Sequence, residues 1–170
     1  MKIQLRPSLL KVRRQTVKWI IIHHTAELYP QESARIDNAK FQIPELYKGV
    51  LEHKTGDINY HYVIEKIKED YHVITMRPFS YLCEWEDIDM NINNRAIHIA
   101  ILGEYNFKVP ESRLYDILAY RVINPLLKLF HLNPSKIKLH NEVSSNKTTC
   151  PGEFFDKDIL IAKVRRFFIK

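Results

Sequence analysis

Continuous apolar runs mark three places in the 170-residue chain where buried strands are expected. Residues 17–22, VKWIII, are mostly β-branched, which is typical of a strand that is buried on both faces. Residues 95–102, RAIHIAIL, predict a central strand that ends at Gly103. Residues 136–139 predict a short strand that leads directly into His140.

Periodic patterns predict the other elements. Residues 57–65 alternate with the period of a strand, residues 71–76 form another strand, and the charged KIKED between them predicts a hairpin turn. From Pro110 onward, apolar residues repeat at helical spacing until Pro125, which we expect to end or kink the helix, with residues 126–131 as a possible continuation for another turn or two. Residues 156–168 predict a C-terminal amphipathic helix.

The remaining segments complete the predicted architecture. Residues 29–53 are mostly helical in composition but are interrupted by Pro44 and Gly49, and residues 79–94 predict a long surface loop. Residues 1–15 form a basic N-terminal extension, either a strap on the domain or a mobile arm. About five strands interleaved with about three helices predict an α/β or mixed α+β fold, with a single central mixed sheet flanked by helices.

Composition limits the class of protein. A chain of 170 residues that is 45% hydrophobic and 27% charged is an ordinary globular protein, and we expect one domain over residues 1–170. Its apolar runs are too short to cross a bilayer, so no membrane insertion is expected. Residues 1–18 lack the apolar core of a secretory signal, and the two cysteines, Cys83 and Cys150, cannot form a disulfide framework. Synthesis in a reducing cytoplasm is therefore predicted.

The net charge of +6 favours a polyanionic partner, such as nucleic acid, anionic lipid or an anionic cell-wall polymer. The sequence contains no helix-turn-helix, RNA-binding signature or Cys/His finger spacing, and the charge excess is modest. We therefore expect no nucleic-acid partner.

One short segment concentrates residues that could hold a metal. In residues 140–152, HNEVSSNKTTCPG, nine residues separate His140 from Cys150, and the run WIIIHHTA ends far upstream in His23 and His24. Two imidazoles and one thiolate make a three-ligand zinc set with a fourth position open for water, which is the pattern of a catalytic rather than a structural zinc. Taken alone, Cys150 is better explained as a small buried hydrophobic residue, and it is the pairing with His140 and the Pro-Gly that follows which favour a ligand.

The other histidines carry no such signal. His98 lies inside a strand with a buried pattern and is interpreted as structural. Four more have no acidic or thiol partner at a useful spacing and are interpreted as surface or core residues: His53, His61, His72 and His131.

Four segments in this order, WIIIHHTA, DINYHYVI, NRAIHIAILGEY and HNEVSSNKTTCPG, resemble the N-acetylmuramoyl-L-alanine amidase type 2 family. This superfamily includes phage amidase lysozymes and peptidoglycan recognition proteins. The resemblance covers a core of residues 16–168, and its most specific parts are the HHTA-like strand end and the T-x-C-P-G motif. It implies a mixed sheet covered by helices, with Zn²⁺ at the base of a substrate cleft.

The resemblance also implies roles for particular residues. The metal ligands would be His23, rather than His24, together with His140 and Cys150. Tyr60 matches a family tyrosine near the metal. Thr148 matches the position that steadies the developing oxyanion, although Lys147 lies one place before the family's lysine position, so either residue could do that work.

Two further departures from the family pattern are visible. Asn141 and Glu142 replace the Arg-Asp that usually follows the ligand histidine, and the hairpin lacks its usual glycine. Neither departure removes a metal ligand.

The function implied is that of a zinc-dependent amidase, which hydrolyses the amide between N-acetylmuramic acid and the L-alanine of peptidoglycan. An endolysin made in the cytoplasm, released to the bacterial cell wall and acting as a monomer fits the missing export signal best. The alternatives are a cytoplasmic muropeptide-recycling amidase and a non-catalytic peptidoglycan-binding module. A protein that binds nucleic acid through its basic arm, with a structural zinc or no metal, is the rival from another class.

Overall fold

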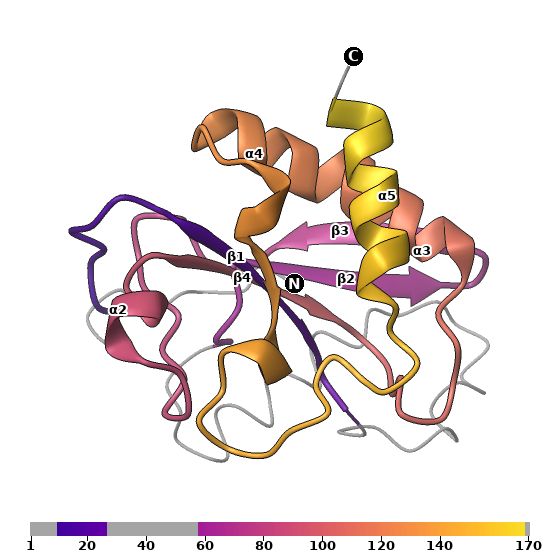
Figure 1. The fold of residues 1–170 in the computed structure, drawn as a ribbon, viewed down its shortest axis with the longest axis horizontal. Helices are drawn as coiled ribbons and strands as arrows, with labels where there is room; N and C mark the ends of the chain where they lie inside the picture. Colours follow the sequence, from indigo (N-terminus) through magenta and orange to yellow (C-terminus); the bar gives the residue numbers. More distant parts are fainter. Residues whose placement is uncertain (1–9, 27–57, 169–170) are drawn as a thin grey trace.

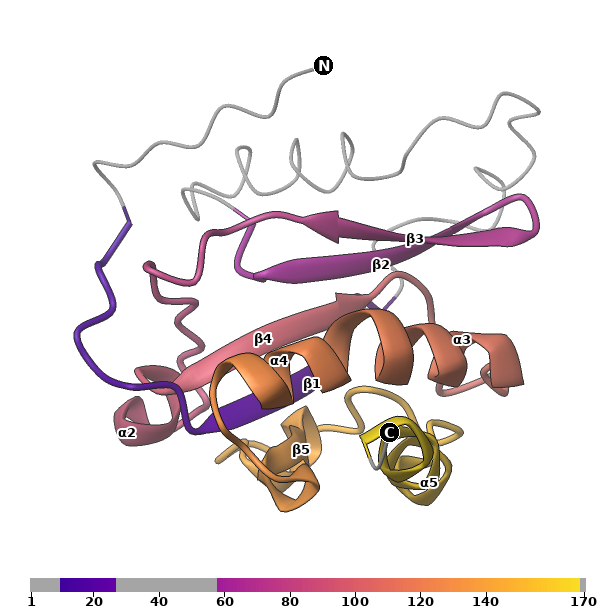
Figure 2. The ribbon, with the colours of Figure 1, turned by 90° about the horizontal axis from the view of Figure 1, so that it is seen from above.

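The computed structural model describes residues 10–26 and 58–168, which form a single mixed sheet covered by helices (Figure 1). The five strands lie in the order β3-β2-β4-β1-β5. The three inner strands are β2 (Tyr62–Ile67), β4 (Ala96–Ile101) and β1 (Trp19–His24), and all three are parallel. At one edge β3 (Asp70–Thr75) pairs antiparallel with β2, and at the other β5 (Ile137–Leu139) pairs parallel with β1 (Figure 2). The predicted fold class is confirmed.

The strand boundaries differ from the predicted ones in two places that matter for function. β1 begins at Trp19 and continues through His24, so both histidines lie inside the strand rather than after it. β2 begins only at Tyr62, so Tyr60 precedes the strand. The hairpin without glycine is closed by Lys68, which adopts a positive φ of 54°. An L-residue can occupy this left-handed region at some cost, and glycine only makes the turn easier.

The predicted helix after Pro110 is one continuous rod of three segments: α3 (Ser112–Ile117), the π-helical η3 (Leu118–Ile123) and α4 (Asn124–Leu129). Pro125 does not end it. The Asn124 N–H bonds the carbonyl of Ala119, five residues back, and this wider turn precedes the proline ring. The rod ends after Leu129, and the positive φ of 53° at His131 follows.

The remaining helical elements are short, apart from the last. The predicted loop of residues 79–94 contains α2 (Met90–Asn93), and single turns η4 (Pro134–Lys136) and η5 (His140–Glu142) flank β5. The predicted C-terminal helix is α5 (Lys157–Phe168). The predicted helical segment of residues 29–53 lies outside the described residues. No helix in the described part of the chain is long and apolar enough to span a membrane.

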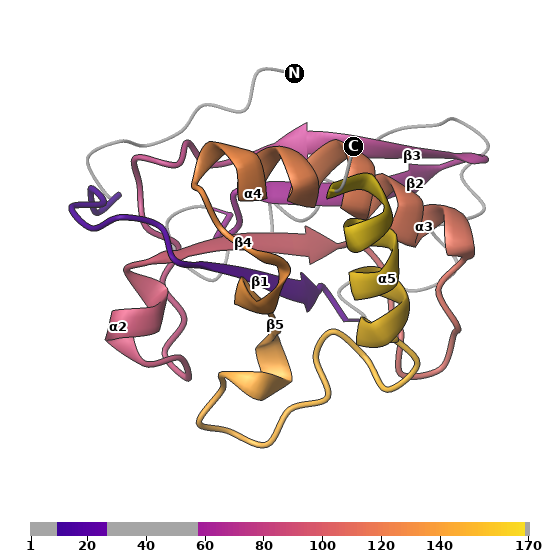
Figure 3. The same cartoon turned by 45° about the horizontal axis from the view of Figure 1, so that its top comes forward.

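The helical rod and α5 cover one face of the sheet, while α2 and the loop after β5 extend to the other side (Figures 1 and 3). The covered face is apolar: Ile20 and Ile22 of β1 pack with Ile97 and Ile99 of β4 and with helix residues such as Leu118. Because successive side chains of a strand point to opposite faces, the residues between these isoleucines point away from the helices. His98 lies between two of these isoleucines, and His23, which follows Ile22, points to the same face as His98.

The end of the basic extension is fastened to the sheet through Arg13. Its guanidinium donates hydrogen bonds to the carbonyls of Phe79, Asn94 and Ala96, each at 2.8 Å. These acceptors lie at the two ends of the segment between β3 and β4, so Arg13 ties those ends together. The segment that Arg13 fastens carries Trp85 and Asp87, which both reach the candidate site.

Candidate metal centre

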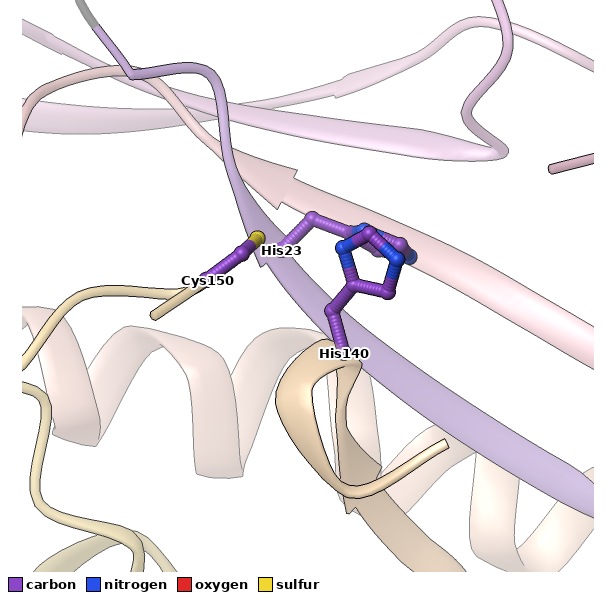
Figure 4. Close-up of side chains that lie close together, drawn as sticks. All are labelled: His23, His140 and Cys150. Atoms are coloured by element: carbon purple, nitrogen blue, oxygen red, sulfur yellow. The ribbon is translucent and has the colours of Figure 1, made fainter. Parts of the chain in front are cut away.

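Three side chains from three parts of the chain converge at one end of the sheet: His23, His140 and Cys150 (Figure 4). Each offers one ligand atom, and these atoms lie within 4.8 Å of one another. The strand register explains why the two histidines meet. Ile22 of β1 pairs with Leu139 of β5, and His23 and His140 are the residues that directly follow this pair. All three residues are buried.

Strand alternation distinguishes His23 from His24. His23 follows Ile22 and points to the face away from the helices, where it meets His140. The ring of His24 lies instead beside Tyr105, and its Nδ1 accepts the Tyr105 N–H at 3.4 Å. His24 contributes to the site through its backbone, since its N–H donates to the Sγ of Cys150 at 3.3 Å.

In the described part of the chain, each of the two imidazoles makes its hydrogen bond through Nε2, which leaves Nδ1 as the atom to offer to a metal. His140 Nε2 lies 2.9 Å from Oδ2 of Asp87, so it carries the proton and Nδ1 keeps its lone pair. His23 Nε2 lies 3.0 Å from Nδ1 of His98. The Nδ1 of His23 is buried and has no hydrogen-bond partner among the residues that the structure describes. An orphaned imidazole nitrogen beside a second imidazole and a thiol is the donor set of a metal site, so the residues present fit a bound Zn²⁺.

The loop that carries Cys150 is closed on itself. Asn141 N–H bonds the Cys150 carbonyl at 2.9 Å, which joins the two ends of the segment between the candidate ligands. Thr148 Oγ1 accepts the Cys150 N–H at 3.2 Å. After the cis Cys150–Pro151 bond, Gly152 has a φ of 114°, and a Cβ there would come within 2.6 Å of the Tyr105 carbonyl oxygen. Glycine is therefore required at this position by both the backbone conformation and the close approach of Tyr105.

The residues that replace the usual Arg-Asp support this loop. Glu142 accepts the Leu139 N–H at 2.6 Å and the ammonium of Lys157 at 2.6 Å. The carboxylate thus anchors the turn after β5 to the first turn of α5.

Burial keeps the candidate ligands neutral in the absence of a cation. It lowers the pKa of His23 well below its usual value, with the neighbouring His140 adding to the effect, and it lowers the pKa of His140 against the opposing influence of Asp87. Burial raises the pKa of the Cys150 thiol to about 12. Two neutral imidazoles suit a cation, and the thiol would release its proton when a metal binds.

Aromatic rings surround the candidate ligands. Trp85 stacks on His23 with a centroid separation of 4.7 Å and an interplanar angle of 20°, and it lies 5.4 Å from the His140 ring. The Tyr60 ring meets His23 edge-on at 5.5 Å. Tyr60 is buried, which raises the pKa of its hydroxyl, so it remains a proton-carrying donor at neutral pH.

The two candidate oxyanion donors occupy different environments. Thr148 is half-buried and lies two residues from Cys150, with its hydroxyl engaged by the Cys150 N–H. Lys147 is exposed. Their roles stay predictions.

Three residues of the site were given no functional role by the sequence analysis. Asp87 and Trp85 come from the segment predicted only as a surface loop, and their place depends on the pairing of Ile88 with Ser144. Asp87 is fixed there, because its carbonyl accepts the Ser145 N–H at 2.6 Å and its carboxylate accepts the Ser144 hydroxyl at 2.5 Å. His98, interpreted as structural, is fully buried and also contacts His23. The sequence did contain one indication of a special role for His98, because it is a polar residue between two isoleucines of a central strand.

The mixed sheet and the His-His-Cys cluster define a fold class in which helices cover one face of the sheet and a candidate metal site lies at the strand ends. The family model of N-acetylmuramoyl-L-alanine amidases (Amidase_2) matches residues 13–153. The chain belongs to this family.

Several solved structures have a similar fold. The N-acetylmuramoyl-L-alanine amidase LysC from Clostridium intestinale is 20% identical, with 92% of this chain and 89% of that chain covered and a TM-score of 0.69. The Ph2119 endolysin from a Thermus scotoductus bacteriophage is 22% identical, with 91% and 89% covered and a TM-score of 0.62. A Drosophila PGRP-LB mutant in complex with tracheal cytotoxin is 19% identical, with 88% and 83% covered and a TM-score of 0.61. No curated protein sequence matches the chain.

Proposed function

We propose that this chain is a zinc-dependent N-acetylmuramoyl-L-alanine amidase that hydrolyses the amide between N-acetylmuramic acid and the L-alanine of peptidoglycan. The observation that carries the proposal is the convergence of His23, His140 and Cys150, with the buried Nδ1 of His23 left without a partner among the described residues. A family member that had become only a binding module would have no need to keep three donors together.

An amide is a poor electrophile, so its hydrolysis needs an activated nucleophile and a place for negative charge. Zn²⁺ bound at this site would supply both, by lowering the pKa of water and by polarising the carbonyl group. His23 and His140 would hold the ion through their Nδ1 atoms, and Cys150 would hold it as a thiolate that accepts the His24 N–H. Two neutral ligands and one anionic ligand leave the ion a net charge of +1.

Tyr60 is proposed to donate its phenolic O–H to the oxygen on which negative charge develops. Its hydroxyl keeps its proton at neutral pH because burial raises its pKa, and its ring lies against His23. Thr148 or Lys147 is proposed as a second donor. The Thr148 hydroxyl accepts one hydrogen bond in the structure, so its own proton is available to donate.

The biological role proposed is that of an endolysin that is made in the cytoplasm and acts on the bacterial cell wall after release, as a monomer. Support comes from the likeness to an endolysin fold and from the basic charge, which favours encounter with an anionic wall polymer. A muropeptide-recycling amidase would use the same site on soluble fragments.

The decisive test of function is digestion of purified peptidoglycan with and without a chelator, followed by mass spectrometry of the products. We expect free stem peptides with L-alanine at the new amino terminus, lost when the chelator is present and restored by zinc. Soluble muropeptides are digested in parallel.

The outcomes separate the alternatives. Cleavage of muropeptides but not of intact sacculi would indicate a recycling amidase. Binding to sacculi with zinc retained and no cleavage of either substrate would contradict the proposal and indicate a binding module. A salt-dependent shift on DNA would indicate the nucleic-acid alternative.

A further inference from the structure

We propose that His98 is a positioning residue of the metal centre: it accepts the Nε2–H of His23 and thereby fixes the His23 ring with Nδ1 turned toward His140 and Cys150. This inference rests on the proposed function only in requiring that the site binds a metal.

The sheet places His98 beside His23. In β4, His98 pairs with Ile21 of β1, while His23 pairs with Ala100, so the two histidines are diagonal neighbours on adjacent strands. Both side chains point to the face away from the helices. His23 Nε2 and His98 Nδ1 are 3.0 Å apart, and the two ring centroids are 5.2 Å apart.

The direction of this hydrogen bond follows from the donor set. If His23 offers the lone pair of Nδ1 to a metal, its neutral ring carries the proton on Nε2. The hydrogen bond to His98 is then donated by His23 and accepted by Nδ1 of His98. Ligand histidines in proteins usually donate this second N–H to a carboxylate, a carbonyl or water, and here a neutral imidazole takes that place.

The ring of His98 is itself held in place. His61 stacks nearly parallel to it, at an interplanar angle of 16° and a centroid separation of 6.1 Å, and the Nδ1 of His61 accepts the backbone N–H of His98 at 3.0 Å. The Trp85 ring is also nearly parallel to that of His98, at an interplanar angle of 25° and a centroid separation of 6.4 Å, and it stacks on the His23 ring. The surroundings of the buried His98 ring thus include two nearly parallel flat side chains, His61 and Trp85.

A purely structural role explains less. His98 is fully buried, and its Nε2 has no hydrogen-bond partner within residues 10–26 and 58–168. Burying a polar atom without a partner costs stability, and valine or isoleucine would fill a central strand better. The bond to His23 is the contact that only a residue with an acceptor at this position can provide.

The experiment compares two substitutions with opposite chemistry. In His98→Asn the side-chain carbonyl oxygen can occupy the position of Nδ1 and accept the same hydrogen bond, whereas His98→Phe keeps a ring and has no acceptor. Zinc affinity is measured by competition with a chromophoric chelator, and the absorption spectrum of the Co²⁺-substituted protein reports the ligand geometry. Thermal unfolding of the metal-free proteins reports stability separately.

We expect His98→Phe to bind zinc about 10- to 100-fold more weakly and to show an altered Co²⁺ spectrum, while His98→Asn stays near the wild-type affinity. His98→Val, a strand-compatible residue that also lacks the acceptor, replaces His98→Phe if the larger ring prevents folding. Wild-type zinc affinity in the acceptor-free variant would overturn the proposal. The proposal would also be overturned if His98→Asn and the acceptor-free variant lost zinc affinity equally, in parallel with their losses of thermal stability.

The zinc-binding assay contains no substrate, so its result on His98 can be distinguished from a failure of the proposed amidase activity. A wild-type chain that binds zinc and cleaves no peptidoglycan would contradict the amidase proposal and leave the role of His98 supported by the variants. A wild-type chain that binds no zinc would overturn the role of His98.

Discussion

The two faces of the sheet are made by the same strands but solve different problems. The face under the helical rod and α5 is filled with aliphatic side chains such as Ile20, Ile99 and Leu118, which need no particular partner beyond a good fit. The opposite face carries His23 and His98 on adjacent strands, and there one polar ring depends on a particular contact with the other. Stability and chemistry are therefore largely separable in this sheet, because alternate residues along each strand serve one or the other.

The largest expected effect comes from removing a candidate ligand. His140→Ala or Cys150→Ala should abolish both zinc retention and hydrolysis, because two donors cannot hold the ion in its place. Metal analysis and product analysis of the purified variants check this. Cys83→Ala, which removes the other buried cysteine, is the matched control and should retain one zinc per chain. Full activity in either ligand variant would contradict the site assignment.

A donor to the developing charge should matter less than a ligand. Tyr60→Phe should lower kcat by roughly a hundredfold and leave zinc binding intact, since it removes one hydrogen bond made in the transition state. The exposed Tyr120 provides the control substitution, Tyr120→Phe, with no expected change. A Tyr60→Phe variant with wild-type kcat would exclude the hydroxyl from the chemistry.

The support of His140 should have an effect on metal affinity. Asp87→Asn should weaken zinc binding about tenfold or more, because the amide is a poorer acceptor for the His140 Nε2–H than the carboxylate at 2.9 Å. Competition with a chelator measures the change. Asp89→Asn alters an exposed carboxylate that caps α2, and its zinc affinity should equal that of the wild type. Equal affinities for both variants would mean that Asp87 does not orient the ligand.

A substitution on the sheet face that the helices cover should have the smallest effect on the reaction. Leu118→Ala should destabilise the fold by about 2–5 kcal/mol, because it leaves a cavity under the rod. The kcat of the folded variant should be unchanged. Urea unfolding gives the free energy, and a kcat measured well below the unfolding transition gives the comparison. A large fall in kcat at full folding would show that the two faces are coupled.

The sequence predicts the parts of this picture that depend on local pattern. β-branched runs predict β1 and β4, helical spacing predicts the rod, and the segment from His140 to Cys150 indicates a metal site. The convergence of His23 with that segment follows from strand order and register, which a single sequence does not determine.

The parts that could not be predicted are long-range contacts of residues without a motif. Asp87 reaches His140 because its loop pairs with the segment around Ser144, and nothing near Asp87 in the sequence indicates that pairing. The sequence leaves open whether the helix ends at Pro125 or continues beyond it, because the widened turn of η3 that accommodates the proline has no clear sequence signal. The contact of His98 with His23 depends on which strands are neighbours.

The central claim is that hydrolysis depends on a metal held by His23, His140 and Cys150. The most direct test is to strip the protein with a chelator, return zinc in measured steps and count new L-alanine amino termini on peptidoglycan at each step. We predict that cleavage rises in proportion to bound zinc and stops at one ion per chain. Equal cleavage by the metal-free protein, or none at full zinc loading, would contradict it.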